Sequence, residues 1–213
     1  MLIALGAQQV AQGFNDRADA ARARAAIRTE LQTNMSRLDS RSAIRSCVER
    51  RIEEVQVLLE GAAKSGVIDT PRWIGRPQYW TMQIARWEAL AQAGRAALLS
   101  DDELGHYSQL HHWMRNITSE MVVEQADWAK LRTLEHLSDA SPDVLIEFNL
   151  ALQDARYRHW RITQHTALLA GLAREARLKV VPNSIPAPRS ACVAMDTPRP
   201  QAIRESGSPY GEP

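Results

Sequence analysis

The sequence predicts an all-α protein, an elongated bundle of about four helices with a long N-terminal helix and a disordered, proline-rich C-terminal tail. Apolar residues recur every three or four positions along most of the chain, and no stretch alternates like a β-strand. Most prolines lie after residue 179, and 213 residues suffice for one hydrophobic core plus its ends. We therefore expect one helical domain over residues 16–178, between an apolar stub at 1–15 and a tail at 179–213.

The longest predicted helix covers residues 16–60, which contain no proline. Its apolar positions step by three or four residues, with a weak patch at 41–45. Written as heptads, they form a seam that suits packing against near-parallel helices, so this helix needs partner helices to bury it. The seam consists of Ile27, Leu31, Met35, Leu38, Val48, Ile52, Val55 and Leu59.

A shorter second helix is predicted after a loop. Gly61 is the expected end of the first helix, because glycine is common just after a helix C-terminus. The loop continues to residue 76, and Pro77 is placed as the first residue of a helix that ends at Gly94. The apolar face of this helix consists of Trp80, Ile84, Trp87 and Ala91.

Two longer helices complete the predicted bundle. Ser100 and Glu103 have the spacing of a capping box and begin a helix that extends to about residue 137, with the polar Glu124 interrupting its apolar side. Ser141 and Pro142 begin the fourth helix as an N-cap and a first helical residue. Its seam is the most regular in the chain: Leu145, Phe148, Leu152, Ala155, His159, Ile162, Thr166, Leu169, Ala173 and Ala176.

Neither the C-terminal tail nor the two cysteines show a pattern that predicts structure. Residues from 179 onward are rich in proline, serine and glycine, so they bury too little apolar surface to offset the entropy of ordering. Cys47 and Cys192 form neither a metal-ligand spacing nor a disulfide framework. We therefore predict a disordered tail, and the cysteines assign no compartment.

One stretch resembles a known group of proteins. Residues 73–94 read WIGRPQYWTMQIARWEALAQAG, and LLSDDEL follows at 98–104. This stretch, like residues 14–17 and 47–55, resembles a group of uncharacterised bacterial proteins that carry a short N-terminal membrane helix and then a helical body. The resemblance covers most of residues 2–178 and implies a membrane anchor, but no known activity or catalytic residue. This sequence departs from the pattern because most of that anchor is missing.

The N-terminal stub leaves two interpretations open. Residues 1–7 are apolar, but a spanning helix needs roughly 20 such residues, so the stub is either a frayed helix end or the last part of a membrane helix that starts upstream. Basic residues next to a spanning helix favour the cytoplasmic side, which predicts attachment to the bacterial inner membrane with a cytoplasmic body. If Met1 is the true start, we expect a soluble cytoplasmic protein. The basic residues are Arg17, Arg22, Arg24 and Arg28.

Motifs for chemistry are incomplete. Glu103 and His106 have the Glu-x-x-His spacing of di-iron bundles, but those sites need a second such pair, which the sequence lacks. There is no glycine-rich phosphate loop, nucleophile elbow or paired carboxylate arrangement. A net charge of +1 does not indicate a nucleic-acid partner. We therefore predict a protein that is not an enzyme and has no metal, no cofactor and no catalytic residue.

The densest group of aromatic and arginine residues marks a candidate contact site. Arginine stacked on aromatic rings can hold an anionic ligand or a partner peptide, so Trp73, Arg76, Tyr79 and Arg86 are the candidate contact residues. The structural alternative is that Trp80 and Trp87 belong to the core while Trp73 pins the loop to the bundle. His159 interrupts the apolar seam of the fourth helix, either as a pH-sensitive group or as a core histidine held by one hydrogen bond.

Three functions are compatible with these features. The first is a non-enzymatic, membrane-tethered helical bundle that acts through protein contacts, with a protein partner or with a second copy of itself. The second is a ligand-sensing helical domain that uses the cluster at residues 73–87, with an unknown small molecule. A nucleic-acid binder ranks third, because the arginines at 17–28 are outweighed by the near-neutral total charge.

Overall fold

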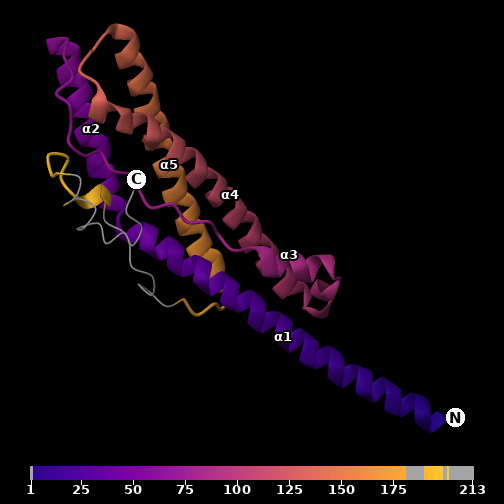
Figure 1. Cartoon of the computed structure of the whole chain (residues 1–213). Coiled ribbons are helices and arrows are strands. Elements are labelled where there is room, and N and C mark those ends of the chain that lie inside the picture. The colour runs from indigo at the N-terminus through magenta and orange to yellow at the C-terminus, as the bar shows by residue number, and fades with distance from the viewer. Residues whose placement is uncertain (1, 181–189, 199–200, 202–213) are drawn as a thin grey trace.

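The structure of the protein, a computed structural model, describes residues 2–180, 190–198 and 201. Within these residues the chain is helical, with no strand beyond an isolated bridge between Val67 and Asp139. The predicted all-α class is therefore confirmed. The bundle is elongated, and a rod formed by the first two helices runs along its whole length (Figure 1).

The predicted first helix is divided into two. Helix α1 spans Leu2–Ala43 and α2 spans Arg45–Ser65, with a break at Ile44 inside the weak apolar patch. The break leaves Ile44 itself buried, and its backbone carbonyl still accepts from Val48 N. The predicted end at Gly61 is wrong, because α2 continues to Ser65 and ends at Gly66, whose φ of 73° is left-handed.

A long strap replaces the first part of the predicted second helix. Residues 67–84 run without regular structure along the bundle, and α3 begins only at Ala85 and ends at Gln92. Side chains of the long helices form hydrogen bonds with the backbone of the strap, so the strap can lie against the core without forming a helix or a strand. Arg37 donates to Thr81 O at 2.5 Å, Gln125 donates to Pro77 O at 3.0 Å, and Asn34 exchanges two hydrogen bonds with the backbone of Gln83 at 2.6 and 2.8 Å.

The last two helices form an antiparallel pair beside the rod. A short 3-10 turn at Arg95–Leu98 leads to α4 at Asp101–Arg132, whose predicted capping box is present. A second turn at Thr133–His136 precedes α5 at Pro142–Glu175. Helix α5 packs against both α4 and α2, so it joins the antiparallel pair to the rod.

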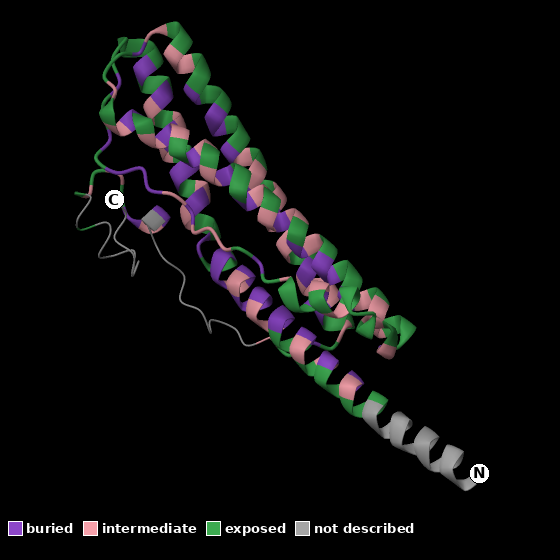
Figure 2. Ribbon diagram, turned by 45° about the vertical axis from the view of Figure 1, so that its right-hand side comes forward, coloured by how far each residue is buried: buried purple, intermediate pink, exposed green. Residues whose placement is uncertain are grey.

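The core consists of two clusters stacked along the bundle. The first lies between α2, the end of α4 and the first half of α5, and the second lies between α1, the start of α4 and the second half of α5. Buried and exposed residues alternate along each long helix, as Figure 2 shows. Buried α5 residues follow the predicted seam, except for Ala151, which lies beside it; those on the seam are Phe148, Leu152, Ala155, His159, Ile162, Leu169 and Ala173.

The C-terminal region departs from the prediction. Residues 190–198 pack on α2, where Cys192 forms a disulfide with Cys47 and the side chains of Ala191 and Val193 are buried. The two cysteines, in which the sequence shows no disulfide framework, are therefore paired, and residues 190–198 do not fit the prediction of a disordered tail. The rest of the predicted tail, residues 181–189, 199–200 and 202–213, lies outside the described residues.

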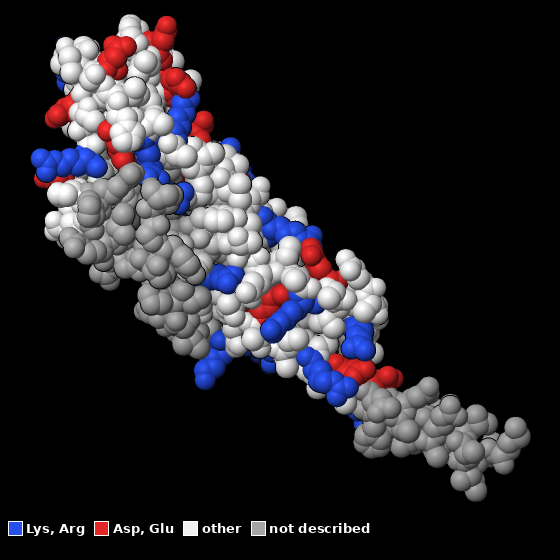
Figure 3. Space-filling view, in the orientation of Figure 1, with Lys and Arg blue, Asp and Glu red and all other residues white. Residues whose placement is uncertain are grey.

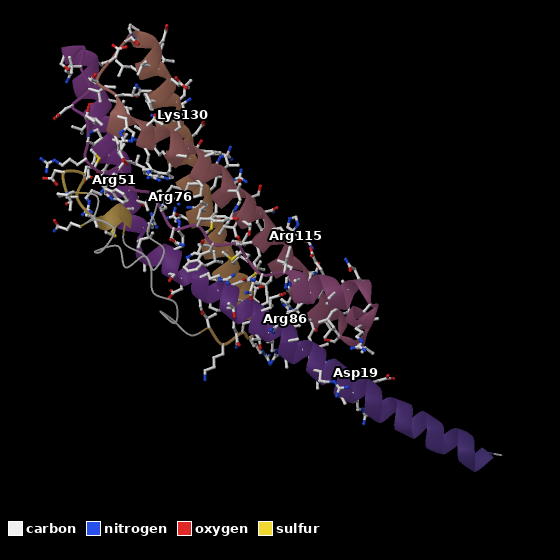
Figure 4. The ribbon with its side chains drawn as sticks, viewed as in Figure 1. Asp19, Arg51, Arg76, Arg86, Arg115 and Lys130 are labelled. Carbon is white, nitrogen blue, oxygen red and sulfur yellow. A yellow bond between two sulfur atoms is a disulfide. The ribbon has the colours of Figure 1, made fainter. Side chains whose placement is uncertain are left out.

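Arg51 fastens three segments to one another. Its side chain is fully buried on α2, where Nε donates to Glu54 at 2.7 Å. Its terminal nitrogens donate to Ile74 O in the strap and to Val193 O in the C-terminal segment, and one also reaches Trp73 O at 3.3 Å. Figure 4 shows Arg51 where the rod and the C-terminal segment meet. The guanidinium therefore donates hydrogen bonds to backbone carbonyls that lie outside any helix or sheet.

The N-terminal stub is only partly described. Helix α1 includes residues 2–15, but their side chains lie outside the described part of the chain. Across the residues that the structure describes, no helix combines the length and the apolar character needed to cross a membrane.

Candidate functional site

The predicted contact residues do not form one cluster. Trp73 is fully buried and its backbone N donates to Met195 O at 2.9 Å, so it anchors the strap as the structural alternative proposed. Tyr79 accepts a hydrogen bond from Thr81 at 3.1 Å. Arg86 is exposed on α3, and Figure 4 shows it well separated from Arg76 along the molecule. The strap and α3 therefore spread these residues along the bundle.

A layer of buried polar side chains separates the two core clusters. It consists of Arg41 from α1, Glu124 from α4 and His159 from α5, each at the point where the apolar seam of its helix is interrupted. Arg41 Nη2 lies 2.6 Å from Glu124 Oε1 and 3.3 Å from His159 Nδ1. We call these three residues the polar layer.

The polar layer is incompletely satisfied. Four of its buried polar atoms lack a hydrogen-bond partner among the described residues: Arg41 Nε, Arg41 Nη1, Glu124 Oε2 and His159 Nε2. Burial raises the pKa of the Glu124 carboxyl, against the opposing charge of Arg41. Burial, reinforced by the charges of Arg41 and Arg45, lowers the pKa of His159 to about 3. The histidine is therefore neutral at neutral pH and keeps a free ring nitrogen.

A groove between α2 and α5 opens beside His159. Its volume is about 420 Å³, and its walls carry both charge signs. Arg45 and Glu49 form an ion pair at 2.7 Å, while Arg156 donates to Gln56 at 2.5 Å. Glu49 also lies 3.9 Å from His159 Nε2, beyond hydrogen-bond distance. The groove is therefore lined by polar side chains that are already paired with one another, and the buried imidazole of His159 lies at its edge.

Helix α5 carries a second apolar face that points away from the core. Five large apolar side chains on this face are between 41% and 62% exposed. Tyr157 and Trp160 stack with their ring centroids 6.0 Å apart, so the centre of the face is aromatic. We call this face the α5 outer stripe, and its members are Ile146, Leu150, Tyr157, Trp160 and Leu168.

Charge on the surface is mixed in sign. Figure 3 shows lysine and arginine interspersed with aspartate and glutamate over the face that it presents, without a continuous basic area. Arg158 and Arg161, which flank the outer stripe, both pair with Glu120 of α4, at 2.9 and 2.8 Å. Among the described residues that Figure 3 presents, no surface resembles the basic one by which proteins bind nucleic acid.

Two other histidine and glutamate pairs have structural roles. Glu30 accepts hydrogen bonds from the backbone N of Arg86 and Trp87 and lies 3.0 Å from His111 Nε2, so it caps the start of α3. Glu103 is held by Arg24 at 2.8 Å and by the capping box. His106 Nδ1 instead contacts Asp102 O at 2.7 Å. In the described part of the chain, no group of three metal-ligating side chains is found.

Sequence reasoning missed Arg51, the disulfide and the outer stripe. Arg51 lies in a run of charged residues that looks like a solvated face, and two distant cysteines carry no signal for pairing. The outer stripe did have a signal, since Ile146, Leu150, Tyr157 and Trp160 are large apolar residues on the side of the helix opposite the predicted seam.

Protein-family models, curated proteins and solved structures were compared with the chain, and none of them matches it.

Proposed function

We propose that the protein is a non-enzymatic helical scaffold that binds another protein chain through the α5 outer stripe. The exposure of this stripe carries the proposal. Monomeric proteins rarely keep a continuous large apolar surface in water, and burying apolar area contributes about 25 cal/mol per Å². Aromatic residues such as Tyr157 and Trp160 are also the types that dominate binding energy at protein interfaces.

The disulfide between Cys47 and Cys192 supports a proposal for the compartment. Disulfides persist in oxidising compartments and are rare in the cytosol, so we place the body outside the cytoplasm. This placement differs from the cytoplasmic body expected from the arginines at 17–28. A membrane tether at the N-terminus forms a separate part of the proposal. It is supported by the apolar residues 1–7 and by the resemblance to membrane-anchored helical proteins.

The proposal can be tested by photo-crosslinking in living cells. A photoreactive amino acid is placed at Leu150 on the stripe and, as a control, at Val57, which is 68% exposed on α2. We expect discrete protein adducts from position 150 and none of the same size from position 57. Equal labelling at both positions, or no adduct at 150, would overturn the proposal.

A second candidate function is the sensing of a small ligand in the groove beside His159. It is favoured by the free Nε2 of this buried residue at the edge of a 420 Å³ opening. Native mass spectrometry of the protein purified from its own cells tests it. A retained small molecule that is lost in the His159→Asn variant would support this function, whereas protein of the mass of the bare chain in both preparations would refute it.

A further inference from the structure

We propose that the α5 outer stripe binds a second copy of the same chain, with the two α5 helices packed antiparallel about a two-fold axis. This inference rests on the proposed function and names the partner. It follows from the spacing, the symmetry and the charges of the stripe.

The stripe has the spacing of a coiled-coil seam. Along the outer side of α5, positions alternate steps of four and three residues without interruption. This outer seam lies opposite the buried seam, so α5 has two faces that both suit helix packing. A helix that packs against its own chain on one side needs only one seam, so the fold of a single copy does not explain the outer seam. The outer seam consists of Ile146, Leu150, Gln153, Tyr157, Trp160, Gln164, Ala167 and Gly171.

The seam is nearly symmetric about its centre. When it is read backwards from Gly171, aromatic residues meet aromatic residues and glutamines meet glutamines. In an antiparallel pair centred between residues 158 and 159, Tyr157 packs on Trp160 of the second copy, and Gln153 lies opposite Gln164 of the second copy. Leu150 then packs beside Ala167 and Leu168. A buried pair of glutamines is the kind of polar contact that selects one register of a coiled coil.

The flanking charges distinguish the antiparallel pair from a parallel one. In the antiparallel register, Asp154 faces Arg161 of the second copy, and symmetry repeats this contact between opposite charges. A parallel pair in register would instead bring Arg156 close to Arg161 of the second copy, which is a contact between like charges. The antiparallel pair therefore has the favourable electrostatics, as salt bridges beside a seam set helix orientation. It also places the two α1 helices at opposite ends of the dimer, so the dimer rests on the scaffold function alone and is an alternative to tethering both N-termini in one membrane.

The first test is the oligomeric state of the purified full chain, measured by light scattering. We expect a dimer for the wild type, a monomer for Trp160→Glu, and a dimer for Val57→Glu, which places the same charge on an exposed apolar position of α2. Circular dichroism of Trp160→Glu is expected to match the wild type, because the side chain is exposed. A monomeric wild type, or a Trp160→Glu variant that remains dimeric, would overturn the proposal.

The second test determines the orientation by disulfide crosslinking. The variants Gln153→Cys and Gln164→Cys are oxidised separately and as an equimolar mixture; the native cysteines are already paired with each other. We expect a crosslinked dimer only in the mixture. Crosslinking of Gln153→Cys alone would overturn the antiparallel arrangement.

The two proposals fail in distinguishable ways. If the purified chain is a monomer but position 150 still gives adducts in cells, the partner is a different protein and the scaffold function stands. If the chain is a monomer and position 150 gives no adduct, both proposals are wrong.

Discussion

Arg41 and Glu124 form an ion pair in the interior of the bundle, 2.6 Å apart, with side chains that are 3% and 0% exposed. Replacing Arg41 alone leaves the carboxylate buried without its partner. We expect Arg41→Met to lower the free energy of unfolding by about 3–5 kcal/mol, as for other buried pairs that lose one member. Urea denaturation monitored by circular dichroism measures this loss.

The double variant Arg41→Met with Glu124→Leu is the matched control. An apolar pair of similar volume removes the unpaired charge, so we expect the double variant to be more stable than Arg41→Met alone. If the double variant were the less stable of the two, the cost would come from lost packing and not from the uncompensated carboxylate.

His159 should make the protein sensitive to acid. Its pKa is about 3 in the folded chain and about 6.5 when unfolded, so the stability that it contributes is fully present above pH 6.5 and is lost as the pH falls toward 3. The groups facing it are Arg41, Arg45, Glu49 and Glu124. Between pH 7 and pH 5 we expect His159→Asn to lose about 1–2 kcal/mol less stability than the wild type. Parallel pH profiles for the two proteins would contradict the assignment.

Removing the disulfide should free the C-terminal segment. The bond closes a loop across 145 residues of sequence separation, for which loop-closure entropy predicts a stabilisation of about 4–5 kcal/mol. We expect Cys192→Ser and Cys47→Ser to lose similar amounts of stability in thermal denaturation, since each removes the same bond. Arg50, which donates to Cys192 O at 2.8 Å, would then lose this acceptor. A much smaller loss in one of the two variants would show that the bond contributes little and that the other cysteine matters by itself.

Trp87 should be important for stability and not for binding. It is 8% exposed and stacks on His111 with ring centroids 4.9 Å apart. We expect Trp87→Ala to cost about 3–5 kcal/mol, the typical cost of truncating a buried tryptophan. Val57→Ala is the control, because that side chain is 68% exposed on α2, away from the outer stripe, and its loss should hardly change the melting temperature. A variant of Trp87 that melts like the wild type would show that the residue is not part of the core.

Helical periodicity predicted most of the fold because the packing partners of each helix are themselves helices with complementary seams. The capping box at Ser100 and the N-terminus at Pro142 were both confirmed, since these signals are local. The strap was not predicted. Pro77 is compatible with a helix start, but the segment from it to Gln83 is held in an irregular conformation by Asn34, Arg37 and Gln125, which are distant in sequence. Such tertiary contacts leave no local pattern.

The polar layer shows the same limit for the candidate site. Each of its members was visible in the sequence as a separate irregularity: the weak patch that contains Arg41, the polar Glu124 on an apolar side, and His159 in a regular seam. Periodicity identifies the position of each residue along its own helix. It does not determine how far the three helices are shifted along one another. That axial shift brings Arg41, Glu124 and His159 into contact.

The bond between Cys47 and Cys192 also determines how the molecule would respond to a mechanical pull. It closes residues 47–192 into a covalent ring that contains α3, α4, α5 and nearly all of α2, while α1 lies outside the ring. A force applied between the two ends of the chain passes from α1 through the two sulfur atoms and into the last residues of the chain. The ring is not part of this load path, so the force would pull α1 away from the second core cluster while the disulfide prevents residues 47–192 from being extended.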